Sequence, residues 1–361
     1  MSSVVGAVDD PDEVTADWLT AVLRSAGHDA VVRDVRLERI GTGQIGRSYR
    51  LFLDLEHAGD LPPTLVLKIA AGDAEARQRV NRGFEKEVRF YQDLAPHTSV
   101  NIPRCWFAAI TEDLNSFVLL LDDLAPRVPG RQTDGCSFEQ ATAAVVNLAG
   151  LHAPMWGSEL LDVHTSWLSP MDAESGEFLG AIMGSSTEQF IELYSDRLSA
   201  EDQQTLRDAA SVTGAWAGMK PRQFTLIHGD YRLDNLMFAL AGTGSTDVSA
   251  VDWQTTTAGS PTLDVAYFLG TSLVSDERRR HDMALLASYV DALAAYGVSY
   301  SIDDAAADYR RDVLHGPLIT VLGRVYATAA PTPEADEMFL AMATRSCAAI
   351  RDLGTLEAVR G

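Results

Sequence analysis

The sequence predicts a two-lobed α+β fold, in which a small lobe built on an antiparallel β-sheet precedes a larger, mainly helical lobe. The chain has 361 residues, which is long for a single compact core. Alternating apolar residues concentrate in its first third, whereas helical periodicity dominates after residue 131. We therefore expect a flexible acidic tail at 1–13, the small lobe at 14–121 and the larger lobe at 122–361.

The small lobe is predicted to begin with one helix and three strands. Apolar residues recur at helical spacing between Thr15, a potential cap, and Gly27, a potential stop. Alternation of apolar and polar residues then predicts strands in VVRDVRLERI, RSYRLFLDLE and TLVLKIA. The links between them are short, which is typical of an antiparallel meander.

The pattern changes twice more along the chain. An amphipathic helix is predicted at about 74–95, followed by strands in RCWFAAI and SFVLLLDDL. Beyond Pro126 the periodicity is helical. We expect helices at 137–153, about 186–197, 200–217 and in several segments from 276 to the end.

Composition limits the class of partner. The formal net charge of −22 argues against nucleic acid and anionic membranes, and permits a cationic substrate or a divalent metal. Cys105, Cys136 and Cys347 lie too far apart for a zinc site or disulfide framework. The N-terminal stretch has no signal-peptide pattern, and no apolar run approaches the about 18 residues of a membrane span. We expect a cytoplasmic protein, and no protein partner can be inferred.

A glycine-rich turn, GTGQIGRSY, lies between the first two predicted strands and contains Gly41, Gly43 and Gly46. Its GxGxxG spacing is weak evidence for a Rossmann fold, because a strand and not a helix follows the last glycine. Backbone N–H groups of such a turn can fold over nucleotide phosphates, since no side chain holds them away. A plain hairpin with a glycine bulge explains the pattern equally well.

Lys68 interrupts the apolar strand LVLKIA and must reach either water or a carboxylate. Glu87 on the next helix is a candidate partner, and Glu85 competes for the same role. A lysine held by a helix glutamate presents a fixed ammonium to nucleotide phosphates. The extended backbone around Leu121, at the end of FVLLLDDLAP, could pair with an adenine edge, although an ordinary interdomain linker is the alternative.

The densest group of polar residues is LIHGDYRLDNLMF at 226–238, flanked by apolar stretches. Asp230 and Asn235 have the HxD-x4-N spacing of a phosphoryl-transfer loop. The aspartate would accept or orient a hydroxyl proton, and the asparagine would offer a neutral oxygen to magnesium. Arg232 is placed to steady a phosphoryl group by charge. No role emerges for Asp234, and the alternative for the whole block is a turn rich in Asp and Asn.

A predicted hairpin follows this loop. LMFALAGTGSTDVSAVDW has the pattern of a strand, a turn and a strand, and it ends at Asp252. A hairpin returns the chain close to its starting point, so Asp252 is expected beside Asn235 and able to bind the same metal ion. Each of these features is weak evidence alone. Together they are far more specific for phosphoryl transfer, because they occur in one order: glycine turn, strand lysine, helix glutamate, HGD loop and later aspartate.

These motifs resemble the aminoglycoside phosphotransferase and choline kinase superfamily. HGDYRLDN (228–235), VDWQ (251–254) and SPTLDVAYFL (260–269) are similar in particular to the ecdysteroid-kinase-like (CHK-type) small-molecule kinases, and LAGLHAPMW (148–156) fits that group too. The resemblance covers nearly the whole chain. It implies a protein-kinase-like fold, and transfer of the γ-phosphoryl group of ATP (or GTP) to a small-molecule hydroxyl with Mg²⁺.

The resemblance also implies roles for individual residues. Asp230 would be the catalytic base, Asn235 and Asp252 the magnesium ligands, and Lys68 with Glu87 the nucleotide clamp. Asp264 would anchor the catalytic loop by hydrogen bonds, and His228 would brace the same loop. The scattered residues His152, His164 and His315 lack metal-ligand spacing, so we expect packed or surface histidines.

The acceptor stays open at this level. The acidic balance suits an aminoglycoside, whereas the ecdysteroid-kinase-like motifs suit an apolar or steroid-like alcohol. HGD in place of HRD, and the lack of an APE-ended segment after Asp252, point away from a protein substrate. The alternatives are a non-catalytic nucleotide-binding protein and a protein kinase. The hypothesis of a nicotinamide-dependent oxidoreductase rests on the glycine turn alone, and the strand that follows this turn argues against it.

Overall fold

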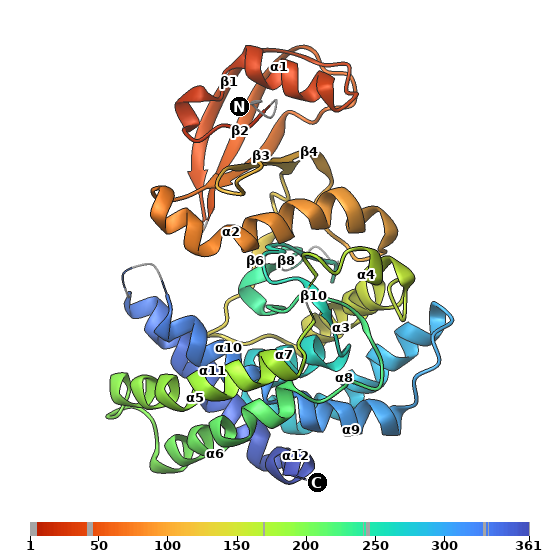
Figure 1. Cartoon of the computed structure of the whole chain (residues 1–361). Helices are drawn as coiled ribbons and strands as arrows, with labels where there is room; N and C mark the ends of the chain where they lie inside the picture. The colour runs from red at the N-terminus through yellow and green to blue at the C-terminus, as the bar shows by residue number, and fades with distance from the viewer. Residues whose placement is uncertain are drawn as a thin grey trace. The chain divides into compact units, whose positions relative to one another are not determined.

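The computed structural model describes residues 6–41, 46–168, 170–240, 242, 246–327, 330 and 332–360. The chain forms two compact units (Figure 1). The first comprises Met1–Pro96, Ile102–Ala125 and Asp252–Thr255, and the second comprises His97–Asn101, Pro126–Val251 and Thr256–Gly361. The first unit carries the large sheet and the second is mainly helical, so the predicted α+β organisation is confirmed.

The first unit is built on a five-stranded antiparallel sheet in the order β1-β2-β3-β5-β4. Alternate apolar residues of the sheet, such as Leu51, Leu65 and Leu67, share one core with α1 (Ala16–Ser25). The first three strands form the predicted meander. The strands are β1 (Val31–Ile40), β2 (Gly46–His57), β3 (Thr64–Ala70), β4 (Cys105–Ile110) and β5 (Phe117–Asp122).

The helix α2 (Ala74–Arg89) places two carboxylates on the buried side of the first unit. It begins at Asp73, whose side chain accepts the N–H of Ala76. Glu85 and Glu87 are among its buried residues. The predicted helix at about 74–95 changes to a π-helical turn at Phe90–Leu94, a feature that is frequent near functional sites.

Residues 6–13, from the tail expected at 1–13, belong to the first unit and contact the rest of it. Val8 is 5% exposed and joins the hydrophobic core. The Asp9 carboxylate accepts hydrogen bonds from Arg77 Nη1 (2.5 Å) and Ser116 Oγ (2.6 Å). An apolar side chain and an acid with two donors anchor this segment, whereas residues 1–5 lie outside the described part of the chain.

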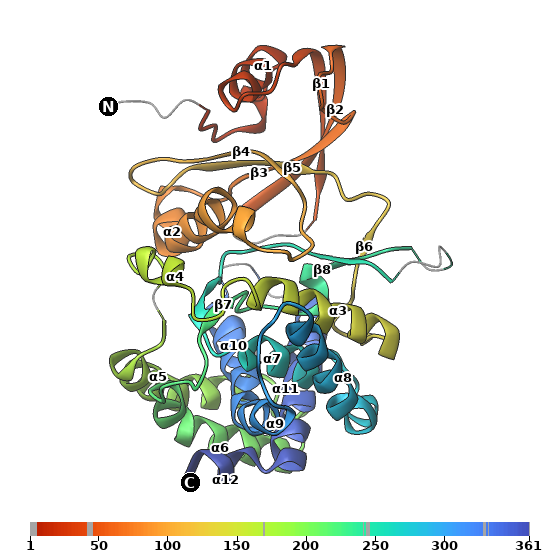
Figure 2. The ribbon, with the colours of Figure 1, turned by 90° about the vertical axis from the view of Figure 1, so that its right-hand side faces the viewer.

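The second unit is organised around the buried helix α7, as Figure 2 also shows. Every residue of α7 is buried, and it contacts α3, α8, α9, α10 and α11. The helices of this unit are α3 (Phe138–His152), α4 (Glu159–Val163), α5 (Ala173–Leu193), α6 (Ala200–Ala217), α7 (Thr262–Ser272), α8 (Ser275–Ala295), α9 (Ile302–Asp312), α10 (His315–Val325), α11 (Pro333–Leu353) and α12 (Thr355–Arg360).

Helix α5 differs from the segment at about 186–197 that the sequence predicts. The helix starts much earlier, at Ala173. The sequence prediction missed its first half because the glycines there lower helix propensity and obscure the periodicity. Those glycines permit a close helix crossing: a Cβ on Gly176 would lie 2.8 Å from the carbonyl oxygen of Gly214 in α6. Tertiary packing therefore decides this helix, whereas α3 and α6 lie where the sequence predicts them.

Among the described residues of the second unit there are also five short strands. β7 (Thr225–Ile227) pairs with β10 (Thr257–Gly259), and β6 (Val128–Pro129) joins the pair β8 (Leu236–Phe238) and β9 (Val248–Ala250). The register of Leu236 opposite Ala250 confirms the predicted hairpin.

Within the described ranges, no helix combines the length and apolar character that a membrane crossing needs.

Candidate active site

The segment 228–235, termed the 228–235 loop, connects β7 to β8 within the second unit. Its two ends are held by one residue of the hairpin. His228 Nε2 lies 3.1 Å from the carbonyl oxygen of Val251, and the N–H of Val251 donates to the carbonyl of Asn235 at 3.0 Å. The hairpin therefore sets the loop geometry, and Asp252 is the next residue along the chain.

Asp264 of α7 holds the first residues of the 228–235 loop. Its Oδ2 accepts the N–H of His228 at 2.7 Å, and its Oδ1 accepts the N–H of Gly229 at 2.8 Å. Gly229 has a φ of 82°, which favours glycine at this turn. Burial opposes the charge of Asp264, but the hydrogen bond from His152 and the neighbouring His228 outweigh it, so the pKa is lowered. An ionised carboxylate therefore anchors the loop.

Two histidines have a role that sequence reasoning missed. His152 is packed, as expected, and its two ring nitrogens contact Tyr289 Oη (2.8 Å) and Asp264 Oδ2 (3.2 Å). His315 is also packed, and its Nε2 lies 3.0 Å from the carbonyl oxygen of Gly229. The Nδ1 of His315 has no hydrogen-bond partner among the described residues, and burial lowers its pKa. The neutral ring with a proton on Nε2 therefore donates to the loop.

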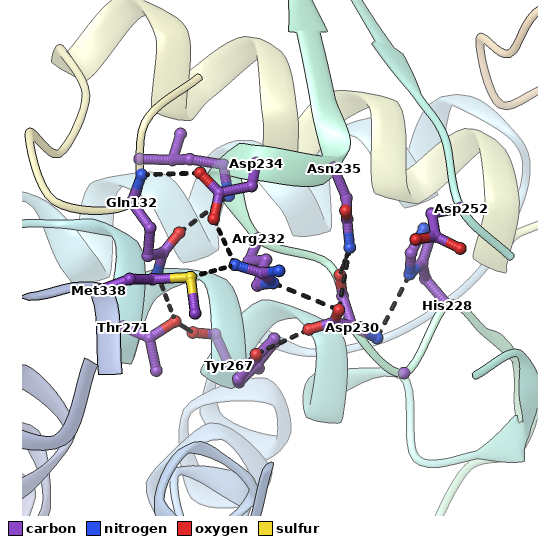
Figure 3. A network of polar contacts seen from close by, with 12 residues as sticks. Gln132, His228, Asp230, Arg232, Asp234, Asn235, Asp252, Tyr267, Thr271 and Met338 are labelled. Carbon is purple, nitrogen blue, oxygen red and sulfur yellow. Dashed lines mark hydrogen bonds and ion pairs between the residues drawn. The ribbon is translucent and has the colours of Figure 1, made fainter. Parts of the chain in front are cut away.

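Asp230 is held through both carboxylate oxygens (Figure 3). Oδ1 accepts the hydroxyl of Tyr267 at 2.7 Å, and Oδ2 accepts from Asn235 Nδ2 at 3.0 Å and Arg232 Nε at 3.2 Å. Burial, and then the charge of Asp230, raise the pKa of Tyr267 well above its usual value. The phenol thus stays a donor. Tyr267 follows Asp264 by one helical turn, and that spacing is the signal that could have identified it.

Asn235 has a fixed amide orientation. Its Nδ2 donates to the Asp230 carbonyl at 2.9 Å as well as to the Asp230 carboxylate. An amide nitrogen has two protons, so both are used and Oδ1 is the atom left to face another partner. Such an oxygen is a ligand type that Mg²⁺ accepts.

Arg232 lies between two aspartates. Nε contacts Asp230, and Nη1 contacts Asp234 Oδ2 and, at 2.9 Å, Met338 Sδ. Burial opposes the positive charge, but Asp230 and the neighbouring Tyr267 and Asp234 outweigh it and raise the pKa of Arg232. The guanidinium is therefore charged and held on two sides.

A second group of charges lies in the first unit around Lys68 of β3. Its Nζ is 2.7 Å from Glu87 Oε2 and 3.1 Å from Asp252 Oδ1. Burial lowers the pKa of Lys68, but Asp252 and Glu87 outweigh it and the pKa is raised. Burial also raises the pKa of Glu87 against the pull of Lys68. Glu85, the competing candidate, pairs with Arg82 and Arg89 instead.

The three residues of the DWQ motif all contact this part of the first unit. Asp252 contacts Lys68, the Trp253 ring stacks on Phe90 at a centroid distance of 3.7 Å, and Gln254 Nε2 donates to Glu87 at 3.4 Å. Asp252 has a φ of 69°, which is uncommon for a non-glycine residue and typical of functional positions. The motif therefore combines packing with a strained, partly exposed carboxylate.

The remaining nucleotide-site candidates have different environments. A Cβ on Gly46 would lie 2.9 Å from Lys68 Cε, so this glycine permits β2 to approach the lysine. Gly41 has a φ of 69°, and Gly43 lies outside the described residues. Leu121 is paired with Val66 on one side and Cys105 on the other, so it lies inside the sheet and not at an edge.

The structure thus groups the candidates into two sets, one in each unit. The first unit brings together Gly46, Lys68, Glu87 and Asp252, and the second brings together His228, Asp230, Arg232, Asn235 and Asp264.

Comparison with known proteins identifies a family and a fold. A model of the ecdysteroid kinase-like family matches residues 47–298. No curated protein matches the chain. Among solved structures, the amicoumacin kinase hAmiN, in complex with AMP-PNP, Ca²⁺ and Ami, is similar with a TM-score of 0.54 and 10% identity, over 91% of this chain and 92% of its own.

Two further structures are similar. The GDP complex of wild-type aminoglycoside 2'-phosphotransferase-IIIa has a TM-score of 0.53 and 14% identity, over 92% of this chain and 98% of its own. Plasmodium vivax ethanolamine kinase has a TM-score of 0.50 and 12% identity, over 87% of this chain and 82% of its own. At these identities the likeness concerns the fold, and the predicted protein-kinase-like fold class is confirmed.

Proposed function

The chain belongs to the ecdysteroid kinase-like family, and on this premise we propose that it is a kinase that phosphorylates a hydroxyl group of a small molecule. The γ-phosphoryl group of ATP or GTP is transferred with the help of Mg²⁺. The observation that carries the proposal is the arrangement of Asp230. This carboxylate lies in a loop held at both ends, its side chain is 23% exposed, and three donors fix its orientation.

Asp230 serves as the base of the reaction. Each carboxylate oxygen has two lone pairs, so an oxygen that already accepts from Tyr267 or Asn235 can still accept from an alcohol. The acceptor hydroxyl donates its proton to Asp230 while its oxygen attacks phosphorus. Arg232 stabilises the negative charge on the transferring phosphoryl group. Positioning and charge supply most of the rate in such reactions.

Lys68 and Glu87 form the nucleotide clamp. Glu87 is 1% exposed on its side chain, so it holds the lysine ammonium at one place. That ammonium binds the α- and β-phosphates, and the turn with Gly41, Gly43 and Gly46 covers them. The nucleotides in the similar structures, GDP and AMP-PNP, support a nucleotide as the donor.

Asn235 and Asp252 are the residues that would hold Mg²⁺. The fit is in the donor atoms: Asn235 presents its amide oxygen, and the Asp252 carboxylate is 42% exposed on a strained backbone. Hard oxygen ligands of this kind suit the ion, which also takes phosphate and water oxygens. When bound, the ion neutralises charge on the nucleotide phosphates.

An acceptor with few positive charges is favoured over a polycationic aminoglycoside. In the second unit, Arg232 lies beside Asp230, and the apolar side chain of Met338 contacts Arg232. The acids of this region are engaged by arginines of the chain itself, since Asp234 pairs with Arg232 and Asp336 pairs with Arg324. The acceptor class that fits is an uncharged, largely apolar alcohol, including steroid-like alcohols.

The test is a screen for release of ADP or GDP in the presence of Mg²⁺ over alcohols, sterols, sugars, choline and aminoglycosides. The proposal expects turnover with an alcohol, and loss of Mg²⁺-dependent nucleotide affinity in Asp252→Ala. Nucleotide binding without turnover on any acceptor would favour a non-catalytic protein. Labelled phosphate that appears on protein instead would favour a protein kinase.

A further inference from the structure

Asp234 is the residue of the 228–235 loop for which sequence reasoning offers no role. We propose that Asp234 is a positioning residue, which together with Gln132 holds the guanidinium of Arg232 in place throughout phosphoryl transfer. The inference rests on the proposed function and assigns a task that the HxD-x4-N spacing does not contain.

The three charges lie together at the start of a short helix. Arg232 has φ −134° and ψ 165° and directly precedes the 3-10 helix Leu233–Asn235, which contains Asp234. Its guanidinium contacts both Asp230 and Asp234. Their side chains, like that of Arg232, are only partly exposed: 23% and 34% against 19%. Figure 3 shows the guanidinium directed between the two carboxylates.

Asp234 is itself held from outside the loop. Its Oδ1 accepts the backbone N–H of Gln132 at 3.1 Å, which leaves Oδ2 for Arg232. Gln132 is 1% exposed, and its Oε1 accepts the N–H of Leu233 at 3.0 Å. Arg345 Nη1 of α11 donates to the carbonyl of Gln132 at 2.5 Å. A buried network thus fixes the carboxylate that fixes the arginine.

The second carboxylate matters because the first one changes charge. When Asp230 receives the proton of the acceptor hydroxyl, its attraction for Arg232 falls. Asp234 does not take part in that transfer and keeps the ion pair. The contacts given for Arg232 in the described part of the chain use Nε and Nη1, which leaves Nη2 to face a phosphoryl oxygen. A guanidinium held at both Nε and Nη1 can keep this orientation.

Asp234→Asn separates the two tasks of the residue. An asparagine still offers an oxygen to the N–H of Gln132, but it lacks the charge that holds Arg232. We expect kcat to fall by about 10- to 100-fold, as for a small displacement of a catalytic group, with nucleotide Kd and acceptor KM within about twofold of the parent. The matched control is Asp134→Asn. Asp134 is an exposed acid two residues after Gln132, and it pairs with Arg131.

A double-mutant cycle decides whether Asp234 acts through Arg232. In an Arg232→Gln background, Asp234→Asn should lower kcat further by less than about threefold. An equal fold loss in both backgrounds, or no loss in the parent, would overturn the proposal. Asp234→Glu, which keeps the charge, should retain more activity than Asp234→Asn.

A spectroscopic measurement keeps this test separate from the proposed function. In ¹⁵N spectra of arginine side chains, a guanidinium held on Nη1 gives resolved Nη signals because rotation about Nε–Cζ is slow. The signals assigned to Arg232, by their absence in Arg232→Gln, should collapse in Asp234→Asn and persist in Asp134→Asn. Signals that stay resolved in Asp234→Asn would reject the role of Asp234, whether or not an acceptor has been found. Failure of every acceptor in the screen would instead reject the proposed function.

Discussion

Lys68 in the first unit and Arg232 in the second each lie between two carboxylates, yet the two clusters are held differently. Around Lys68, Glu87 is 1% exposed, whereas Asp252 is 42% exposed and has a strained backbone. Around Arg232, both acids have further partners: Tyr267 and Asn235 for Asp230, and Gln132 for Asp234.

This difference leads us to assign ligand binding to the Lys68 cluster and orientation of Asp230 to the Arg232 cluster. Each group has one more negative than positive charge, which under the proposed function leaves one acid for Mg²⁺ beside Lys68 and one for the acceptor proton beside Arg232. The acid beside Lys68 is the more exposed of the two and has a positive φ, so it is the one we expect to reorganise when a metal or nucleotide binds. Asp230 has neutral donors on both oxygens and keeps its direction. Four predictions test this contrast.

The largest effect is expected from Asp230→Asn. The amide cannot accept the acceptor proton as the carboxylate does, so kcat should fall by about 10²- to 10⁴-fold. Nucleotide affinity should stay close to that of the parent, because the Lys68 cluster lies in the other unit and is unchanged. Steady-state kinetics and nucleotide titration check both expectations. A variant that turns over like the parent would remove Asp230 from the reaction.

Lys68→Met should destabilise the first unit. It leaves the Glu87 carboxylate buried without its ammonium partner, which costs about 3 kcal/mol for a buried pair. The double variant Lys68→Met with Glu87→Leu should recover most of that loss in urea denaturation, since no buried charge is left. Nucleotide affinity should stay low in both variants. A double variant that regains affinity would contradict the clamp.

Tyr267→Phe removes one of the donors that fix the orientation of the Asp230 carboxylate, so this carboxylate should be less well positioned. We expect kcat to fall by about 10-fold with acceptor KM unchanged, as for a catalytic group displaced slightly. Tyr231→Phe is the matched control, because its hydroxyl is equally buried and donates to the Ala144 carbonyl at 2.9 Å. Equal losses in the two variants would point to a general packing effect.

The smallest effect concerns pH and His315. Burial lowers the pKa of His315, so below about pH 6.5 the unfolded chain binds a proton that the folded chain does not. Stability should therefore be fully present above about pH 6.5, fall as the pH decreases toward the lowered folded pKa, and then level off. The acids Asp264, Asp312 and Asp230 face the ring and oppose the shift.

His315→Gln tests this slope, because the glutamine amide can still donate to the Gly229 carbonyl. Urea midpoints at about pH 8 and about pH 5.5 should differ less in the variant than in the parent. His281→Gln is the control, since that histidine lies on the surface of α8 beside Glu277. An unchanged pH slope in His315→Gln would show that other groups cause it.

Much of the site follows from local sequence. The meander, the position of Lys68 in a strand and the hairpin that leads to Asp252 can be predicted because alternation and turn residues are short-range signals. The assignment of Asp230 and Asn235 depends on their spacing within one loop. The register of β8 and β9 confirms the predicted hairpin that leads to Asp252.

The partners that make the loop rigid could be identified only in the folded chain. His152, Tyr267 and His315 come from three different helices, and their contacts with the loop or its anchor depend on how α3, α7 and α10 pack. Sequence periodicity reports which face of a helix is apolar, and it does not report which polar atom on that face meets which loop.

The class of fold, the meander of the first unit and the residues proposed for the reaction could therefore be predicted from the sequence. Two features could be identified only in the folded chain. Glu87 and not Glu85 pairs with Lys68, and Asp234 contacts both Arg232 and Gln132. The physical reason is range. Strand alternation and loop spacing act over a few residues, whereas an ion pair between Lys68 and a helix, or a bond between Gln132 and a loop about a hundred residues away, exists only when the core has packed.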